Sequence, residues 1–247
     1  MITLVHRDRA AYSLSSQILR WGLLVGCVLT TWCTLASEAH AEWRRVQDVT
    51  RGTAQVLEKG ELTFGVFAPI AYGVTDDLTV QSSPIFDLLL IPNFAARYSV
   101  FDSRSTVVSL LLSYKQGFYR QQSQPGEIDI GVTATSALTD RVSITGGLYV
   151  SDRFGQTDPG GDAAGLSFHG GLHWLVSPGD LIAASVQQRW SKVGLERPEI
   201  SLTWVTQMTF LFRAHLVLGA SYGTFPLRTS PASTWSIWPT LDIWWRY

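Results

Sequence analysis

The chain has 247 residues, with 19 Lys and Arg against 20 Asp and Glu and a hydrophobic content of 46%. A formal net charge of -1 offers no basic surface for nucleic acid, and the apolar content is too high for a disordered chain. Beyond residue 41, no stretch reaches the roughly 18 consecutive apolar residues that a membrane helix needs. A soluble all-β protein and a transmembrane β-barrel are the two classes that remain.

The N-terminal segment has the pattern of a cleavable secretory signal. Three arginines form its basic leader, at Arg7, Arg9 and Arg20. A largely apolar run follows at 22–36, and Ala39 and Ala41 provide the small residues of a cleavage site. We therefore predict a signal peptide at 1–41 and a single domain at 42–247.

Both cysteines of the chain, Cys27 and Cys33, fall within the predicted signal. The residues before Cys27 also resemble a lipobox, but cleavage there would leave the mostly apolar residues 28–36 at the start of the mature chain. Cleavage after Ala41 is therefore favoured. Without cysteine, residues 42–247 hold neither a disulfide nor a thiolate metal site, which excludes a disulfide-stapled scaffold and a cysteine-based enzyme.

Downstream of residue 60, apolar and polar residues alternate with the period of two that is typical of β-strands. Eleven strands are predicted, at 61–73, 78–85, 93–101, 105–117, 126–137, 141–152, 164–176, 181–191, 198–207, 211–223 and 235–247. Tight turns alternate with longer polar connections, and the longer ones are at 119–126, 153–162, 191–198 and 223–233. Short turns at one end and loops at the other are typical of an outer-membrane barrel.

Such barrels have an even number of strands, and their N- and C-termini both lie on the side of the short turns. Eleven strands therefore require one more. Residues 50–57 can supply it, which brings the predicted all-β, closed antiparallel transmembrane barrel to about twelve strands. Ten strands, with an irregular first hairpin, is the alternative. The segment Asp87–Pro92 fits least well, because it is apolar where an outer loop should be polar. We expect it to fold over the rim or to contact a partner.

Most predicted strands have one apolar and one polar face, a pattern that a soluble β-sandwich would share. Aromatic residues recur near the predicted strand ends, where amphipathic rings sit at a bilayer interface, and this favours a membrane barrel. The polar faces then line the lumen. The predicted lumen-lining residues are Arg97, Lys115, Glu127, Asp129, His169, His173, Arg189, Glu199, Arg213, His215 and Asp242. The opposite facing would cost roughly 2–4 kcal/mol for each cation at the bilayer midplane.

The last predicted strand carries a more specific signal. Apolar and aromatic residues recur there at every second position, among them Leu241, Ile243, Trp245 and Tyr247. This pattern resembles the C-terminal insertion signal of bacterial outer-membrane barrels, although Pro239 removes one ladder donor. The resemblance implies a Gram-negative outer membrane, contact with its lipid, and the barrel-assembly machinery as a partner of the C-terminal strand.

A narrower resemblance lies at the start of the domain. The pattern Thr53-Ala54-x-x-Leu57-x-Lys59-Gly60-x-Leu62 is followed by Tyr72-Gly73-Val74-Thr75-Asp76. Together these residues resemble the opening of outer-membrane transporter barrels similar to the phenol-degradation, MetA-pathway-like family. The resemblance implies a cargo of small hydrophobic or organic molecules, and it carries over no catalytic residue.

The sequence favours no catalytic, cofactor or metal site. His169 and His173 share a face, but four residues along a strand separate them by about 13 Å, too far for one metal ion. The one Gly-x-Ser-x-Gly match, at 219–223, lies within the predicted strand at 211–223 and not at a strand-to-helix elbow, which weighs against a hydrolase. We predict a narrow channel or passive transporter without enzymatic activity. A closed structural or surface-interaction barrel is the alternative, and an outer-membrane hydrolase is the third candidate.

Overall fold

The structure is a computed structural model of the whole chain. It describes residues 52–88, 90, 92–115, 118–119, 122–123, 126–154, 164–191, 194–195, 198–208, 214–223 and 236–247. The predicted signal peptide at 1–41 lies outside the described residues, as do Arg213 and most of the long connections at 153–162 and 223–233.

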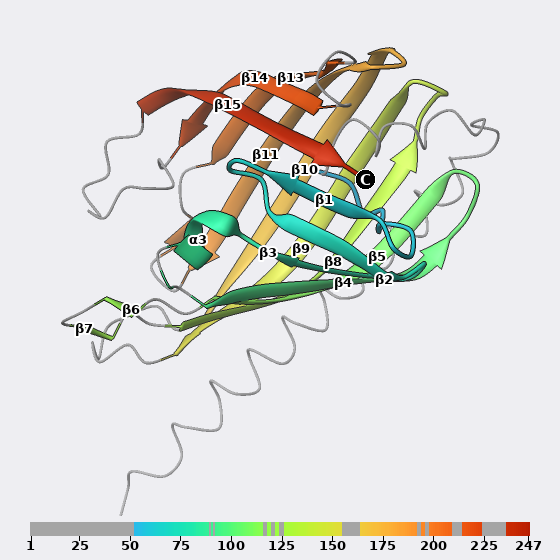
Figure 1. The fold of residues 1–247 in the computed structure, drawn as a ribbon. Coiled ribbons are helices and arrows are strands. Elements are labelled where there is room, and N and C mark those ends of the chain that lie inside the picture. The colour runs from blue at the N-terminus through green and yellow to red at the C-terminus, as the bar shows by residue number, and fades with distance from the viewer. Residues whose placement is uncertain are drawn as a thin grey trace, which may run out of the picture. The chain divides into compact units, whose positions relative to one another are not determined.

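Within the described residues, twelve antiparallel strands form a closed barrel, and each strand pairs with its neighbours along the chain (Figure 1). Their bounds are β1 Leu62–Gly65, β2 Ile70–Thr75, β3 Leu78–Ser82, β4 Asn93–Asp102, β5 Thr106–Lys115, β8 Gly126–Ala137, β9 Val142–Phe154, β10 Ala164–Ser177, β11 Asp180–Ser191, β13 Glu199–Met208, β14 Ala214–Gly223 and β15 Ser236–Arg246. Three two-residue strands are peripheral, namely β6 Phe118–Tyr119, β7 Gln122–Ser123 and β12 Gly194–Leu195. The predicted all-β barrel of twelve strands is confirmed.

The start of the domain differs from the prediction in two ways. Residues 61–73 form the hairpin β1–β2 instead of one strand, because Pro69 in its connection has no N–H for a ladder bond. Residues 52–57, within the stretch predicted as a strand at 50–57, form no strand. The count of twelve is still right, because residues 61–73 form two strands where one was predicted, and this extra strand offsets the missing one at 50–57.

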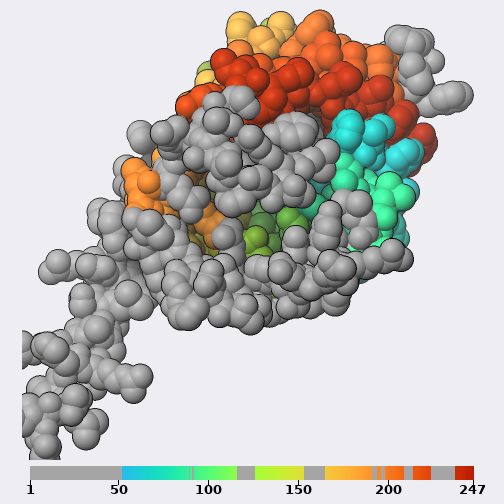
Figure 2. All heavy atoms as spheres, turned by 90° about the vertical axis from the view of Figure 1, so that its left-hand side faces the viewer, coloured from blue at the N-terminus to red at the C-terminus, as the bar shows by residue number. Residues whose placement is uncertain are grey.

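The barrel closes between its first and last strands. The backbones of Leu62 and Tyr247 exchange two hydrogen bonds of 2.8 Å, and Arg246 binds both carboxylate oxygens of Glu61 at 2.8 and 2.9 Å. The ring of Phe64 stacks on that of Tyr247 with centroids 5.7 Å apart. Figure 2 shows this closure as the cyan start of the barrel beside the red last strand.

The outside of the barrel is apolar. Ile130 and Leu202 are 60% and 58% exposed. Other exposed apolar and aromatic residues on the strands are Tyr72, Phe94, Tyr98, Leu110, Leu112, Val150, Phe168, Leu172, Trp174, Trp190, Ile200, Trp204, Tyr222, Ile237, Leu241 and Tyr247. The inner face is polar instead, with buried hydroxyl side chains at Thr63, Thr79, Ser109, Thr133, Thr135, Ser143, Thr145, Ser151 and Ser167. A soluble barrel has the reverse arrangement, so the alternation predicted from the sequence is confirmed with its apolar side outward.

Four of the predicted tight turns are described, and local side-chain bonds close each of them. These bonds are Asp77 N to Thr75 Oγ1 at 3.3 Å, Thr106 N to Ser103 Oγ at 3.0 Å, Val142 N to Thr139 Oγ1 at 3.0 Å, and Ser177 Oγ to Asp180 Oδ2 at 2.6 Å. The strand order places all four turns at one end of the barrel, which we call the turn side. The opposite end is the loop side.

A short helix, α3 at Pro84–Leu88, lies on the loop side within the segment that was hardest to interpret from the sequence. Asp87 anchors it by accepting hydrogen bonds from Ser82 Oγ at 2.6 Å and from Asn93 Nδ2 at 2.8 Å. Leu88 and Leu90 remain 84% and 81% exposed, so this rim segment is an apolar projection. None of the helices in the described residues is long and apolar enough to cross a membrane.

Candidate functional site in the lumen

The inner wall is built from hydroxyl side chains that pair between neighbouring strands. These pairs are Thr135 with Thr145 at 2.7 Å, Ser185 with Ser201 at 2.6 Å and Ser221 with Thr240 at 2.9 Å. Inward positions that face each other across a ladder lie close enough for such bonds. Each paired hydroxyl therefore has a hydrogen-bond partner within the polar wall.

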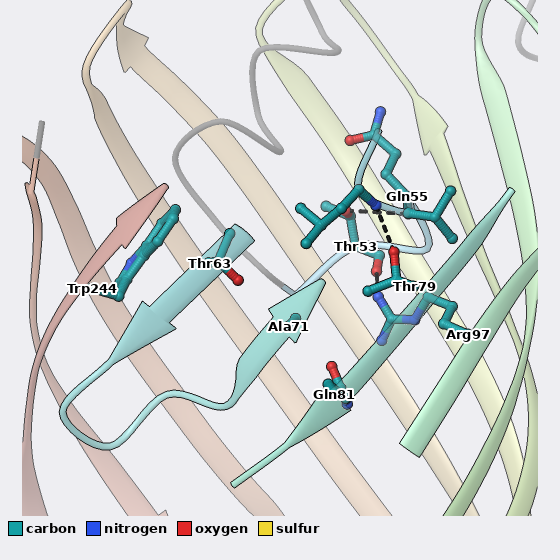
Figure 3. A pocket seen from close by; sticks show the side chains of 10 residues that line it. Thr53, Gln55, Thr63, Ala71, Thr79, Gln81, Arg97 and Trp244 are labelled. Carbon is teal, nitrogen blue, oxygen red and sulfur yellow. Dashed lines mark hydrogen bonds between the residues drawn. The ribbon is translucent and has the colours of Figure 1, made fainter. Parts of the chain in front are cut away.

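Residues 52–57 occupy part of this lumen, and we call them the luminal segment (Figure 3). Three wall side chains bind its backbone: Thr135 Oγ1 accepts from Ala54 N at 2.7 Å, Thr79 Oγ1 accepts from Leu57 N at 2.7 Å, and Arg97 donates to the carbonyl oxygen of Thr53. These bonds give polar partners to a backbone that has no strand neighbour.

Apolar packing also holds the luminal segment. Ala54 is fully buried and packs with Val107 of β5 and Ala137 of β8. A Cβ atom at Gly73 would lie 1.9 Å from the carbonyl oxygen of Glu58, so β2 admits this close approach only with glycine at that position. A cavity of only 50 Å³ remains between the segment and the wall near Thr63 and Trp244.

The lumen holds a cavity of 410 Å³, which we call the main cavity. Five of the predicted lumen residues line it, namely Arg97, Glu127, Asp129, His169 and Arg189. Uncharged polar side chains at Thr133, Tyr149, Ser151, Ser167 and Gln187 complete most of the lining. The luminal segment contributes Gly52 and Thr53. The main cavity is therefore polar and carries both signs of charge.

The charged groups of the main cavity differ in their partners. Arg189 Nη2 lies 3.4 Å from Glu127 Oε1, which makes an ion pair between β11 and β8. Asp129 Oδ2 accepts a hydrogen bond from Ser113 Oγ at 2.8 Å. Arg97 donates to the backbone carbonyl of Thr53 and contacts the luminal segment as well as the cavity.

Tyr149 forms a flat part of the main-cavity wall. Its hydroxyl bonds Thr133 Oγ1 at 2.6 Å. A Cβ atom at Gly131 would lie 2.1 Å from Tyr149 Cδ1, and one at Gly147 would lie 2.8 Å from Tyr149 Oη. These two glycines therefore make room for the ring, which accounts for Gly147 by packing within the wall.

A second cavity of 190 Å³ adjoins the main cavity, since His169 and Gln187 line both. Glu199 lines this second cavity together with Trp238, Ser201 and Ser221. Within the described part of the lumen, the charged lining of the two cavities therefore extends from Arg97 on β4 to Glu199 on β13.

Of the remaining predicted lumen residues, those that the structure describes line neither of these two cavities. Lys115 lies at the loop-side rim, with Nζ 4.2 Å from the ring centroid of Phe86 in α3. His173 is buried at the inner wall of β10. The buried ring of His215 stacks on Trp244 with centroids 3.9 Å apart. Asp242 Oδ1 accepts from Phe67 N at 2.9 Å in the β1–β2 connection, and Arg213 lies outside the described residues.

The turn side of the lumen is narrowed by apolar packing as well. Leu175, Leu181 and Val205 form a buried cluster, with Ala183 and Val217 packed against it. Their strand positions share the parity of the inward residues His173 and His215, so the cluster lies on the inner face. The open volume consequently lies above it, towards the loop side.

Several residues of the lumen were not predicted from the sequence. Thr53 belongs to the luminal segment, which was predicted as a strand, and Gln187 is an uncharged member of the inner face that carries Arg189. Tyr149 lies on β9, which contributes no residue to the predicted lumen set. Trp244 is an aromatic residue that faces inward. Its signal was available, because Trp244 and Trp245 are adjacent in one strand and must face opposite sides.

Metal chemistry has no candidate cluster here: in the part of the chain that the structure describes, no group of three or more His, Cys, Asp and Glu side chains could hold a metal ion. The comparisons with known proteins found no match, either to a protein-family model or to a curated protein. The interpretation of the lumen therefore rests on its geometry. That geometry provides a polar space of small-molecule size inside an apolar cylinder.

Proposed function

We propose that this protein is an outer-membrane β-barrel of a Gram-negative bacterium that acts as a narrow channel or passive transporter for small molecules. The observation that carries the proposal is the apolar outer surface around a polar lumen. Exposed residues such as Ile130 and Leu202 would be unfavourable in water over so large an area, whereas hydrocarbon tails accommodate them. The predicted signal at 1–41 and the C-terminal strand ending at Tyr247 support export and insertion.

The lumen supports passage of small polar solutes. The main cavity and its 190 Å³ neighbour adjoin each other at His169 and Gln187, and several polar side chains line each of them. Hydroxyl and charged groups can replace the hydration shell of a polar solute along such a path. The luminal segment and the Leu175 cluster narrow the turn side, so a conducting path there is small.

Single-channel recording in planar bilayers tests this proposal. We expect small, discrete currents, and we expect Arg97→Glu to shift the reversal potential towards cation selectivity because it reverses a charge in the main cavity. Lys115→Glu makes the same change of charge at the rim and is the matched control, with a smaller expected shift. Protein that migrates as a folded barrel before boiling but carries no current would contradict the proposal.

A closed structural barrel is the second candidate. It is favoured by the contents of the turn side, where the luminal segment is bound by Thr79 and Thr135 and the Leu175 cluster is fully packed. In such a barrel the exposed Leu88 and Leu90 of the rim would be the functional surface. Absence of current in the bilayer experiment would favour this candidate.

A further inference from the structure

Arg97 is a luminal cation without an acidic partner among the residues that the structure describes. Its only described hydrogen bond is donated to the neutral carbonyl oxygen of Thr53, and its buried Nε has no partner there. Arg189, by contrast, faces Glu127 in the same cavity. A partly buried cation without a counter-charge is costly, so Arg97 favours an anionic group brought by a ligand.

Asp129 presents the opposite charge to the same cavity. Ser113 Oγ donates to its Oδ2 at 2.8 Å, and no cation pairs with it in the described part of the chain. Its environment therefore favours a positively charged group. The main cavity thus combines one ion pair that is already satisfied, Arg189 with Glu127, and two separate charges that are not.

The strand register explains why Arg97 and Asp129 do not pair with each other. On β5, Leu111 pairs with Arg97 of β4, whereas Ser113 pairs with Asp129 of β8. The two positions are therefore two strands apart and offset by two residues. Strand spacings of about 4.8 Å and a rise of about 3.4 Å per residue place their Cα atoms about 12 Å apart. A molecule with a charge at each end can bridge such a separation.

We propose that the main cavity binds a small zwitterion, an amino acid that carries one carboxylate and one ammonium group. The guanidinium of Arg97 holds the carboxylate, and the carboxylate of Asp129 holds the ammonium. A simple anion would leave Asp129 facing it with the same charge, and a simple cation would face Arg97 in the same way. The volume of 410 Å³ falls in the size range of small-molecule sites, about 300–1,000 Å³. This inference deepens the proposed function, on which it rests, by naming the class of cargo.

Calorimetric titration of the folded, detergent-solubilised protein tests the site without requiring current. The probes are straight-chain ω-amino acids from glycine to 6-aminohexanoate, because this series spans increasing separations of the two charges. We expect one chain length to bind best, and to bind at least tenfold more tightly than the carboxylic acid or the amine of the same length. Equal binding of all three compounds would overturn the proposal.

Two variants give reciprocal expectations. Asp129→Asn weakens binding of the best ω-amino acid at least tenfold and strengthens binding of the matching carboxylic acid, because the repelling carboxylate is gone. Arg97→Gln weakens binding of the same ω-amino acid and strengthens binding of the matching amine. Lys115→Gln removes a charge at the rim, outside the cavity, and leaves the titrations unchanged. The described hydrogen bond of Asp129 is to Ser113 of β5, so unchanged binding in Asp129→Asn would overturn the proposal even if Arg97→Gln disturbs the fold.

The titration separates failure of this inference from failure of the proposed function. Currents in bilayers together with no preference for zwitterions would refute the zwitterion site and support the channel function. Selective binding of a zwitterion without current would support the binding site and refute the channel function. The protein would then be a barrel that binds its ligand without conducting it.

Discussion

Gly147 has no side chain, and the space that this leaves is occupied by the ring of Tyr149. A Cβ atom at Gly147 would lie 2.8 Å from Tyr149 Oη and 3.1 Å from Thr133 Oγ1, which are the two atoms of a hydrogen bond. The glycine therefore preserves both the place of the ring and its bond. The wall of the main cavity depends on this arrangement, since Tyr149 and Thr133 both line it.

We predict that Gly147→Ala lowers the free energy of unfolding by about 1–3 kcal/mol, the usual range for an overpacked position. Tyr149→Phe removes the atom closest to the added methyl group, so the double variant should lose less than the sum of the two single variants. Urea unfolding in lipid vesicles measures all three. Gly170→Ala is the matched control, because its Cβ would have no contact shorter than 3.3 Å. Strict additivity would show that the ring moves aside freely.

Individual charged residues were predictable from the sequence as far as the side of the strand they occupy. Alternation placed Arg97, Asp129 and His169 on inner faces, and the structure brings them to one cavity. Alternation says nothing about height along the barrel or about what fills the space in front of a side chain. For this reason it did not distinguish the rim position of Lys115 or the stacking of His215 on Trp244.

The luminal segment is the element that departs most from the sequence prediction. Its residues 52–57 are short and mixed in character, and the count of an even number of strands encouraged their assignment as a strand. The break at Pro69 was the missed signal, since a proline without a donor N–H separates β1 from β2. Ala54 packs with Val107 and Ala137, which are far from it in the sequence, so local patterns could not predict these contacts.

We predict that Thr79→Val weakens the hold on the luminal segment. The substitution preserves shape but removes the acceptor of Leu57 N, and a donor left without a partner costs about 1–3 kcal/mol. Thr63→Val is the matched control, because Thr63 Oγ1 is buried beside the same small cavity and has no hydrogen-bond partner among the described residues. Single-channel conductance should rise in Thr79→Val and stay unchanged in Thr63→Val. An equal response in both would show that the segment does not limit the path.

At the scale of the whole molecule, the division between an apolar outside and a polar inside was fully predictable, because a period of two assigns every strand residue to one of two faces. Leu202 and Ser201 illustrate this on β13. Leu202 is 58% exposed on the outside, while Ser201 bonds Ser185 in the lumen at 2.6 Å. What the pattern could not supply was the closed turn side, which depends on side chains from many strands meeting in space.

We predict that Leu202→Arg lowers the free energy of unfolding in lipid vesicles by about 2–4 kcal/mol, since the cation would face hydrocarbon near the middle of its strand. Ser201→Arg introduces the same cation one residue earlier, where it faces the polar lumen, and should cost markedly less. Urea titration of folding into vesicles measures both variants. A larger loss in Ser201→Arg than in Leu202→Arg would show that the outer surface does not face lipid.

The closure between Glu61 and Arg246 joins residues that are 185 positions apart in the chain. Contacts of such long range are slow to form, because the entropy of the whole intervening chain must be lost before they contribute. While the polypeptide is being synthesised, β1 lacks its partner, and its unpaired backbone edge can associate with other chains. The closure between β1 and β15 therefore makes the nascent protein dependent on being kept apart from other chains until the last strand has been synthesised.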